Sequence, residues 1–284
     1  MWTQSRQKEA FMQAQSPMKP GLTEQPSPVA MILAAGYGTR LKPLTDRLPK
    51  ALVSLQGKPL LYYILRRLQS LGIQHVVINV HHYADQILNY LDGRHFPGLL
   101  LSISDESEHL LDTGGALSKA LPLFGLANEV LVHNVDVISD INLHTMLRQH
   151  RTNKAAATLA VRNRHSSRYL RISPEGLLCG WENRADSALR WSGAACPDSQ
   201  QMAFSGIHIL NVSLIRAMPA AGSFPIIPEY LRMAASHRIE AFPHNSDHWM
   251  DMGRPEDLSS LEQWMQTPEG KQWTQQYLDG WSPS

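Results

Sequence analysis

Two aspartates that lie in short apolar segments are the first residues of this chain able to do chemistry. Asp136 closes the run EVLVHNVD, and Asp251 lies much later in the segment HWMDMG. A carboxylate at the end of a buried strand is costly unless it is paired, and a divalent cation is a natural partner. We therefore predict a metal ligand at Asp136. The Asp-x-Gly pattern at Asp251 is also a common turn and is a weak signal by itself.

A glycine-rich and basic loop, MILAAGYGTRLKPLTDRLPKAL over residues 31–52, is the second candidate. Glycine turns expose backbone N–H groups and let a phosphate approach without a Cβ in the way. The loop is neither a P-loop nor a dinucleotide-binding G-x-G-x-x-G loop, because Leu41 stands where both patterns need a glycine. The cations Arg40, Lys42 and Lys50 could hold a triphosphate, or the loop could be a solvated basic segment.

Other polar residues accompany predicted turns. The stretch DTGGALSKAL begins at Asp112 with a tight glycine turn that opens a helix, and Asp140 is expected to cap another helix. The thirteen histidines do not indicate zinc. His244 and His248 are four residues apart, but Pro243 argues against a helix that would bring them to one face.

These candidates need a scaffold, and the apolar pattern before residue 150 predicts one of alternating strands and helices. Such alternation predicts an α/β fold with a Rossmann-like, doubly wound, mixed but mostly parallel sheet. Sheets of this kind bind ligands beyond the carboxyl ends of their strands, which is where Asp136 falls. Strands are expected at 29–34, 75–80, 99–104 and 129–138, and helices at 59–71, 83–91, 115–122 and 141–150.

After residue 150 the pattern changes to strands joined by polar loops. Residues 184–200 are expected to be the least structured loop. Strands are expected at 155–161, 177–183 and 203–210, and helices at 225–236 and 255–266. Residues 1–29, rich in Gln, Ser, Pro and Met, are predicted to be a disordered extension. The main domain is expected over 30–270, followed by a C-terminal tail over 271–284.

Composition argues against several classes of protein. The formal net charge is +1, from 26 basic and 25 acidic residues, which argues against a nucleic-acid partner. No stretch approaches the roughly 18 continuous apolar residues of a membrane span. The two cysteines fit neither a disulfide framework nor a zinc site, and they indicate free thiols in a reducing cytoplasm. Nothing in the composition indicates an oligomeric state.

The ordered pattern L-A-A-G-x-G-T-R-L-x-P-L-T … P-K, from Leu33 to Lys50, resembles the signature of the sugar-phosphate nucleotidyltransferases. These enzymes join a nucleotide to a sugar 1-phosphate and share the nucleotide-diphospho-sugar transferase fold. The resemblance covers most of residues 30–258. It implies that Arg40 stabilises the departing pyrophosphate and that Lys50 holds the α-phosphate, so both are predicted catalytic residues.

The same resemblance implies the other site residues and a division of the domain. The nucleotide-binding part would span about 30–150 and the sugar-binding part about 151–255. Asp136 and Asp251 would hold Mg²⁺. Glu182 would accept hydrogen bonds from sugar hydroxyls, and Ser205 and Gly206 would form the floor of the sugar pocket. The implied nucleotide-binding residues are Leu33, Ala34, Ala35, Gly36, Gly38, Thr39, Thr113, Gly114, Gly115 and Asn134.

The chain departs from the family pattern next to Glu182. Many members carry a lysine there that holds the sugar phosphate, whereas this chain has Asn183. Another cation must then bind that phosphate, and Arg164, Arg168 and Arg171 are the candidates.

The resemblance implies an NTP and a sugar 1-phosphate as substrates, with UTP and the cell-wall sugar N-acetylmuramic acid 1-phosphate, or a related sugar, as the first choice. A guanylyltransferase acting on mannose or heptose 1-phosphate is the alternative. Two other classes stay open: a nucleotide-sugar-dependent glycosyltransferase and a non-catalytic sensor of nucleotide sugars. The glycosyltransferase would need an Asp-x-Asp metal motif, where this chain has Asn134-Val135-Asp136.

Overall fold

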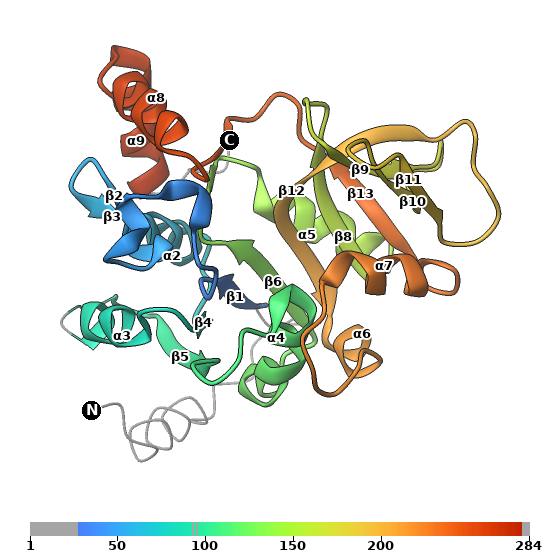
Figure 1. The fold of residues 1–284 in the computed structure, drawn as a ribbon, viewed down its shortest axis with the longest axis horizontal. Helices are drawn as coiled ribbons and strands as arrows, with labels where there is room; N and C mark the ends of the chain where they lie inside the picture. The colour runs from blue at the N-terminus through green and yellow to red at the C-terminus, as the bar shows by residue number, and fades with distance from the viewer. Residues whose placement is uncertain (1–27, 93, 95, 280–284) are drawn as a thin grey trace, which may run out of the picture.

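The computed structural model of the chain describes residues 28–279 except 93 and 95 (Figure 1). The extension predicted over 1–29 therefore lies outside the described residues, apart from Pro28 and Val29. Val29 is buried and already belongs to the first strand, β1 (Val29–Leu33). The packed part of the chain thus includes the last residue that the sequence assigned to the extension.

A mixed sheet of ten strands forms the centre of the fold, in the order β11-β10-β9-β12-β6-β1-β4-β5, with β8 on β12 and β13 on β8. The strands β5, β4, β1 and β6 run parallel, whereas β12 is antiparallel to β6, β8 and β9. The other bounds are β4 His75–Val80, β5 Leu100–Asp105, β6 Glu129–Asn134, β8 Ala157–Arg162, β9 Arg168–Ile172, β10 Leu178–Asn183, β11 Ala188–Trp191, β12 Gln200–Asn211 and β13 Ile239–Pro243. The predicted α/β class with a mixed sheet is confirmed.

The carboxyl ends of three neighbouring parallel strands lie in one row. Leu33 at the end of β1 pairs with Asn79 of β4 on one side and with Asn134 of β6 on the other. The apolar runs that form these strands are buried on both faces, as is typical of a parallel sheet covered by helices. Polar side chains at this edge therefore lie close to one another.

Helices cover both faces of the sheet and bury two separate cores (Figure 1). One core contains residues of α2, α3, α5, α8 and α9, and the other contains residues of α4, α6 and α7. The bounds are α2 Leu60–Ser70, α3 Ala84–Asp92, α4 Asp112–Ala120, α5 Leu143–Thr152, α6 Val212–Arg216, α7 Ile226–Ala234, α8 Pro255–Met265 and α9 Pro268–Asp279. Within the described part of the chain, none of these helices has the length and apolar content to span a membrane.

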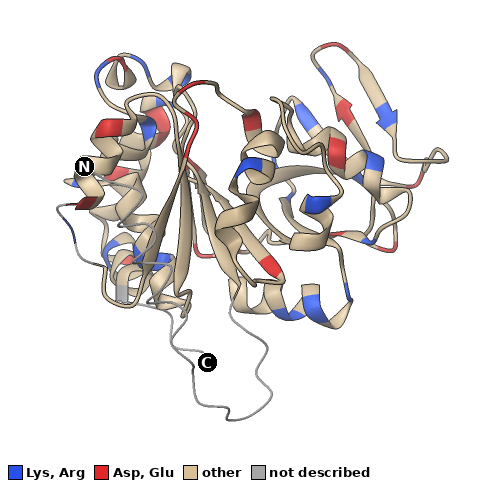
Figure 2. Cartoon of the chain, turned by 90° about the horizontal axis from the view of Figure 1, so that it is seen from below, with Lys and Arg blue, Asp and Glu red and all other residues tan. Residues whose placement is uncertain are grey.

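Charged residues of both signs are interspersed over these elements (Figure 2), in keeping with the formal net charge of +1. The charge that matters for a ligand is therefore local, and it is set by the few side chains that line each cavity.

The predicted strand 129–138 is in fact two strands with different partners. β6 ends at Asn134, the chain turns at Val135 and Asp136, and β7 (Val137–Ser139) begins there. β7 leaves the main sheet to pair with β14 (Trp249–Asp251). Asp136 thus lies at a corner of the chain, where its side chain can face a cavity at the end of the sheet.

Four strands of the second half, β9, β11, β13 and β14, were not predicted from the sequence. β11 lies within the segment 184–200 that was expected to be unstructured, and it pairs only with β10 at the edge of the sheet. An edge strand buries little of its surface, so its sequence shows only a weak apolar pattern.

The segment 271–284, predicted as a tail, begins inside the packed helix α9. Trp273 and Tyr277 of this helix are 4% and 0% exposed and belong to the core that α2 also fills. The indole N–H of Trp273 donates a hydrogen bond of 2.6 Å to Asp140 Oδ2. The main domain therefore includes α9.

Asp140 connects α9 to the segment that leads into β14. Its Oδ1 accepts a hydrogen bond of 2.8 Å from the backbone N–H of His248. The helix-capping role predicted for Asp140 is taken instead by Asn142, whose side chain accepts from Thr145 N at 2.9 Å.

Trp273→Phe is expected to lower the free energy of unfolding by about 1.5–3 kcal/mol, because it keeps a ring in the core but removes a hydrogen bond to a charged acceptor. Urea unfolding would measure the change. Trp264→Phe is the matched control, because within the described residues the Trp264 indole N–H makes no hydrogen bond. Equal losses for the two variants would contradict the role of the Trp273–Asp140 bond.

Candidate active site

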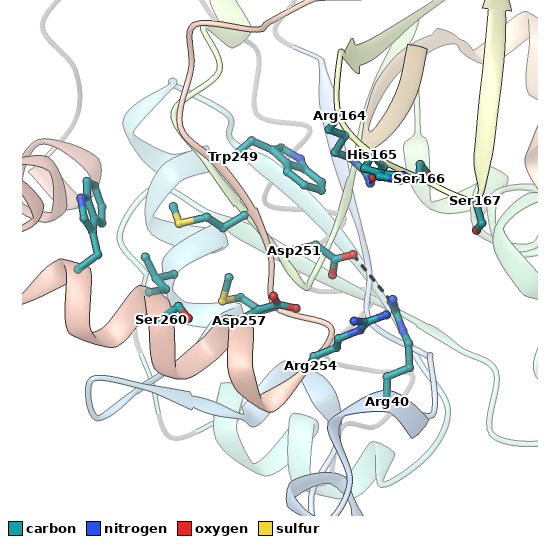
Figure 3. Close-up of a pocket in the computed structure, with 14 residues that line it drawn as sticks. Arg40, Arg164, His165, Ser166, Ser167, Trp249, Asp251, Arg254, Asp257 and Ser260 are labelled. Carbon is teal, nitrogen blue, oxygen red and sulfur yellow. Dashed lines mark hydrogen bonds and ion pairs between the residues drawn. The ribbon is translucent and has the colours of Figure 1, made fainter. Parts of the chain in front are cut away.

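Two cavities adjoin on this side of the sheet, and the first of them lies at the carboxyl ends of β1, β4 and β6. The first, here the inner cavity, has a volume of about 440 Å³, and its lining residues are Leu33, Ala34, Ala35, Gly36, Lys50, Asn79, Glu106, Leu110, Asp112, Thr113, Asn134, Val135, Asp136 and Ser223. The second, here the outer cavity, has a volume of about 610 Å³ and lies between α8, β14 and the loop 163–167 (Figure 3). Its lining residues are Arg40, Arg164, His165, Ser166, Ser167, Trp249, Met250, Asp251, Met252, Arg254, Asp257, Ser260, Leu261 and Trp264.

The inner cavity contains eight residues that the sequence assigned to a site. They come from the loop after β1, from the turn after β6, from the start of α4 and from the short helix Lys50–Leu52. They are Leu33, Ala34, Ala35, Gly36, Lys50, Thr113, Asn134 and Asp136. At Gly36 the loop presents only its backbone to the cavity, and a Cβ on Gly36 would meet nothing within 4 Å. The loop therefore leaves room for a ligand next to its backbone N–H groups.

Lys50 and Asp136 form an ion pair at the inner cavity. The two side chains are only 11% and 15% exposed, so each charge depends on the other for stabilisation. The pairing brings together a predicted catalytic lysine and a predicted metal-binding aspartate. An anionic ligand entering here would find the Lys50 ammonium within the wall of the cavity.

Arg40 and Asp251 form the corresponding pair at the outer cavity, with Nη2 and Oδ2 3.9 Å apart (Figure 3). Asp251 ends β14, and its neighbour Met252 donates a backbone hydrogen bond of 2.7 Å to the carbonyl of Asp136. The two predicted metal ligands are thus held next to each other, Asp251 at the end of β14 and Asp136 in the turn before its partner strand β7. Gly253 allows the close packing here, because a Cβ would lie 2.7 Å from Asp251 Oδ1 and 2.8 Å from Arg40 Nη2.

The carboxylate of Asp251 fits the donor set of a divalent cation. Its Oδ1 is buried and has no hydrogen-bond partner among the described residues. Burial and then the nearby charge of Asp136 raise the pKa of Asp251, while Lys50 and Arg40 act to lower it. A cation between the two carboxylates would relieve this repulsion.

The two carboxylates can be tested against the usual shell of Mg²⁺, the metal that the resemblance implies. The described residues contain no group of three or more His, Cys, Asp or Glu side chains placed to hold a metal. Mg²⁺ is usually bound by one or two carboxylates, with waters and substrate phosphates completing its shell. Asp136 and Asp251 therefore fit Mg²⁺ that arrives with a phosphate ligand.

Four residues predicted to bind the nucleotide line neither cavity. Gly38 has φ +63° and precedes the short helix Thr39–Leu41, and a Cβ on Gly38 would lie 2.8 Å from Thr45 Cγ2. It shapes the loop, and Thr39 begins that helix. The backbone N–H groups of Gly114 and Gly115 both donate to the carbonyl of Phe224, at 2.9 and 3.2 Å. These amides hold the segment before α7 and are not free for a base.

The three residues predicted to bind the sugar also lie outside the walls of both cavities. Glu182 accepts a hydrogen bond of 2.6 Å from Gln201 Nε2, and it pairs with Arg171 at 3.4 Å. Ser205 is 1% exposed, and its hydroxyl lies 2.6 Å from Nε2 of the buried His244.

Gly206 has φ +76°, and a Cβ there would lie 2.7 Å from Asn134 Nδ2. Because Gly206 has no side chain, there is room for the Asn134 amide to lie against β12 at the inner cavity.

Asn79 and Glu106 are site residues that the sequence analysis missed. Asn79 Oδ1 accepts a hydrogen bond of 2.6 Å from Ala34 N, and its Nδ2 donates at 2.8 Å to Glu106 Oε1. Glu106 Oε2 accepts from Leu111 N at 3.1 Å, and burial raises the pKa of this carboxyl. This chain of hydrogen bonds connects the loop after β1 to the segment before α4, on two sides of the inner cavity. The signal was present, since Asn79 is the one polar side chain inside the apolar run VVINV.

A mixed α/β sheet with a glycine-rich loop, two cations and two carboxylates at its carboxyl edge defines a class of protein that binds phosphorylated ligands there. A family model described as nucleotidyl transferase matches residues 29–267, and the chain belongs to this family.

The relatives give the class of reaction. The chain is 32% identical over 240 residues to the N-acetylmuramate alpha-1-phosphate uridylyltransferase of Caulobacter vibrioides, with 82% of this chain and 95% of that protein covered. It is 29% identical over 233 residues to the probable mannose-1-phosphate guanylyltransferase 1 of Oryza sativa subsp. japonica, with 80% of this chain and 62% of that protein covered. The chain is thus an enzyme of the sugar-1-phosphate nucleotidyltransferase type, as its resemblance implied.

A solved structure has the same fold. The crystal structure of HddC from Yersinia pseudotuberculosis superposes with a TM-score of 0.67 at 21% identity, covering 84% of this chain and 100% of that chain.

Proposed function

We propose that the enzyme transfers UMP from UTP to N-acetylmuramic acid 1-phosphate, giving the UDP-sugar and pyrophosphate. The choice of UTP and of this sugar is supported by the relative from Caulobacter vibrioides, which is similar over nearly its whole length. The reaction itself is supported by one observation: the Lys50–Asp136 and Arg40–Asp251 pairs lie side by side where the two cavities adjoin.

The reaction needs little acid–base chemistry, because the sugar 1-phosphate is already ionised. A phosphate oxygen of the sugar 1-phosphate attacks the α-phosphorus of UTP and forms a new P–O bond. The bond from the α-phosphorus to the bridging oxygen breaks, and that oxygen keeps the electron pair and leaves with pyrophosphate. Catalysis then consists of positioning the two phosphates and stabilising charge.

Each charged pair has a role in this step. Lys50, in the wall of the inner cavity, binds the α-phosphate in the ground state and in the transition state. Arg40, at the outer cavity and 58% exposed, reaches the charge that grows on the departing pyrophosphate. Asp136 and Asp251 would hold Mg²⁺, which when bound would neutralise phosphate charge.

The two cavities also support a division of the domain into a nucleotide-binding part over about 30–150 and a sugar-binding part over about 151–255. All residues that line the inner cavity except Ser223 come from the first part. Of the residues that line the outer cavity, only Arg40 belongs to the first part. The nucleotide would thus bind in the inner cavity, and the sugar would extend into the outer one.

Release of pyrophosphate from each of the four common NTPs with a panel of sugar 1-phosphates would test the proposal. We expect the highest kcat/KM with UTP and N-acetylmuramic acid 1-phosphate, at least about tenfold above GTP with mannose 1-phosphate. The opposite preference would replace this substrate assignment with the guanylyltransferase alternative. No pyrophosphate from any pair, with folded protein and Mg²⁺ present, would contradict the reaction.

A further inference from the structure

The phosphate of the sugar substrate needs a cation of its own. Four cationic side chains line the two cavities within the described residues, namely Arg40, Lys50, Arg164 and Arg254. Lys50 and Arg40 are paired with the two aspartates and are assigned to the nucleotide phosphates. The cation for the sugar phosphate is therefore to be found among the remaining arginines.

Arg164 lies in the outer cavity opposite Asp251 (Figure 3). It belongs to the loop between β8 and β9, and two of its N–H groups hold the chain in place. Nη1 donates to the carbonyl of His165 at 3.3 Å, and Nη2 donates to the carbonyl of Phe204 at 3.1 Å. These bonds fix the guanidinium at the wall of the cavity.

One nitrogen of this guanidinium, Nε, has no acceptor among the described residues. A guanidinium carries five N–H donors. The Nε of Arg164 is buried and makes no hydrogen bond within the described part of the chain. Burial lowers the pKa of Arg164, which the charge of Asp251 partly offsets. A half-buried cation whose donors are not all used is stabilised by an anion that accepts several hydrogen bonds at once, as a phosphate does.

Trp249 holds Arg164 from the other side. The guanidinium carbon lies 4.6 Å from the centre of the Trp249 ring, which is a cation–π contact. The indole N–H of Trp249 donates to the carbonyl of Ser205 at 2.9 Å, and the hydroxyl of Ser205 lies 2.6 Å from His244 Nε2. Ser205 thus acts on the cavity through Trp249 and does not reach a ligand itself.

The other arginines near this region fit the role less well. Arg171 is bound to Glu182 at 3.4 Å and to Ser199, and it lines a different cavity. Arg168 is exposed and lines neither the inner nor the outer cavity. Arg254 lies on the exposed rim at the start of α8. Of the arginines Arg164, Arg168, Arg171 and Arg254, Arg164 is the one that lines the outer cavity, is half-buried there and is held in place by hydrogen bonds and a ring contact.

We propose that Arg164 binds the phosphate of the sugar 1-phosphate, with Trp249 as the residue that positions its guanidinium. The inference rests on the proposed function for the identity of the ligand. It fixes the direction of the substrate, with the phosphate between Arg164 and Asp251 and the sugar extending towards α8. The guanidinium offers the phosphate a planar set of donors, whereas a lysine would offer a point charge.

Arg164→Gln and Arg164→Lys would test the proposal, with Arg216→Gln on the surface of α6 as the matched control. In Arg164→Gln we expect the KM for the sugar 1-phosphate to rise about 10–100-fold, the range for lost hydrogen bonds to a charged group. The KM for the NTP should stay within about twofold of the parent. Arg164→Lys keeps the charge but not the planar set of guanidinium donors. Its KM for the sugar 1-phosphate should therefore lie between those of the parent and of Arg164→Gln.

Isothermal titration calorimetry gives a second measurement that does not need turnover. The parent should bind N-acetylmuramic acid 1-phosphate more tightly than N-acetylmuramic acid, and Arg164→Gln should lose most of this difference. A change confined to the KM for the NTP, or an unchanged preference for the phosphorylated sugar, would overturn the proposal. If both variants have a lower melting temperature but bind the sugar 1-phosphate as the parent does, Arg164 has a structural role. That result would also overturn the proposal.

The two proposals fail in different ways. If the parent turns over mannose 1-phosphate with GTP, the substrate proposal is wrong, and the same variants are then measured with mannose 1-phosphate and mannose. If the parent releases no pyrophosphate with any pair, the proposed function is wrong, while calorimetry with sugar 1-phosphates still tests Arg164.

Discussion

Asp136→Asn is expected to lower kcat by about 10³-fold while the protein still folds. The substitution removes one of the two carboxylates that fit Mg²⁺, and stabilisation of phosphate charge by the metal contributes several kcal/mol to such reactions. Asn keeps an oxygen that can accept from Lys50, so the buried ammonium is not left without a partner. The ion pair is nevertheless lost, and we expect a loss of about 1–3 kcal/mol in the free energy of unfolding.

The metal role can be separated from a role in stability alone. Pyrophosphate release would be measured over a range of Mg²⁺ concentrations and in EDTA, next to thermal unfolding of the same samples. The control is Asp46→Asn, since Asp46 is an exposed carboxylate of the same lobe that pairs with Lys42 at 3.1 Å and lines neither cavity. Full turnover in EDTA, or an Asp136→Asn variant as active as the control, would contradict the metal assignment.

The arrangement of the parallel strands could be predicted because each strand carries its own signal. The runs that form β1, β4 and β6 are apolar on both faces, and their order along the chain with helices between them indicates a parallel sheet. Given that sheet, chemistry at the carboxyl edge follows, so the sequence alone predicts that Asp136 and Leu33 lie near each other.

The parts that the sequence did not predict depend on partners far away in the chain. Gly114 and Gly115 are a plausible nucleotide turn in sequence, but Phe224 occupies their N–H groups. Asp140 has the sequence setting of a helix cap, but Trp273 and His248 are its partners. Local pattern gives the type of a residue and its place on an element, whereas tertiary hydrogen bonds decide which donors remain for a ligand.

Arg40→Ala is expected to lower kcat by about 10²–10³-fold, with a much smaller rise in the KM for the NTP. Arg40 is exposed and lies 3.9 Å from Asp251, so it is only loosely held before the reaction. Its contact strengthens as charge grows on the leaving pyrophosphate, and an interaction of this kind acts on kcat. The magnitude is that of removing one charged donor at a site of developing negative charge.

Lys50→Ala should behave differently, because Lys50 is buried against Asp136 and already faces the inner cavity. The variant should bind the NTP more weakly as well as react more slowly. It should also unfold more easily, since a carboxylate that is 15% exposed loses its partner. Steady-state kinetics at saturating Mg²⁺ and thermal unfolding would measure both effects.

Another cation of the same loop, Lys42, supplies the comparison that decides between a phosphate-binding loop and a solvated basic one. Lys42 is 62% exposed, pairs with Asp46 and lines neither cavity. Lys42→Ala removes the same charge from the same loop and should stay within about 0.5 kcal/mol of the parent in stability and close to it in kcat/KM. If binding depends on where each cation points, Arg40→Ala and Lys50→Ala should each differ from Lys42→Ala, in kcat and in NTP affinity respectively. Equal and small effects of all three substitutions would mean that the loop is a solvated basic segment that does not bind phosphate.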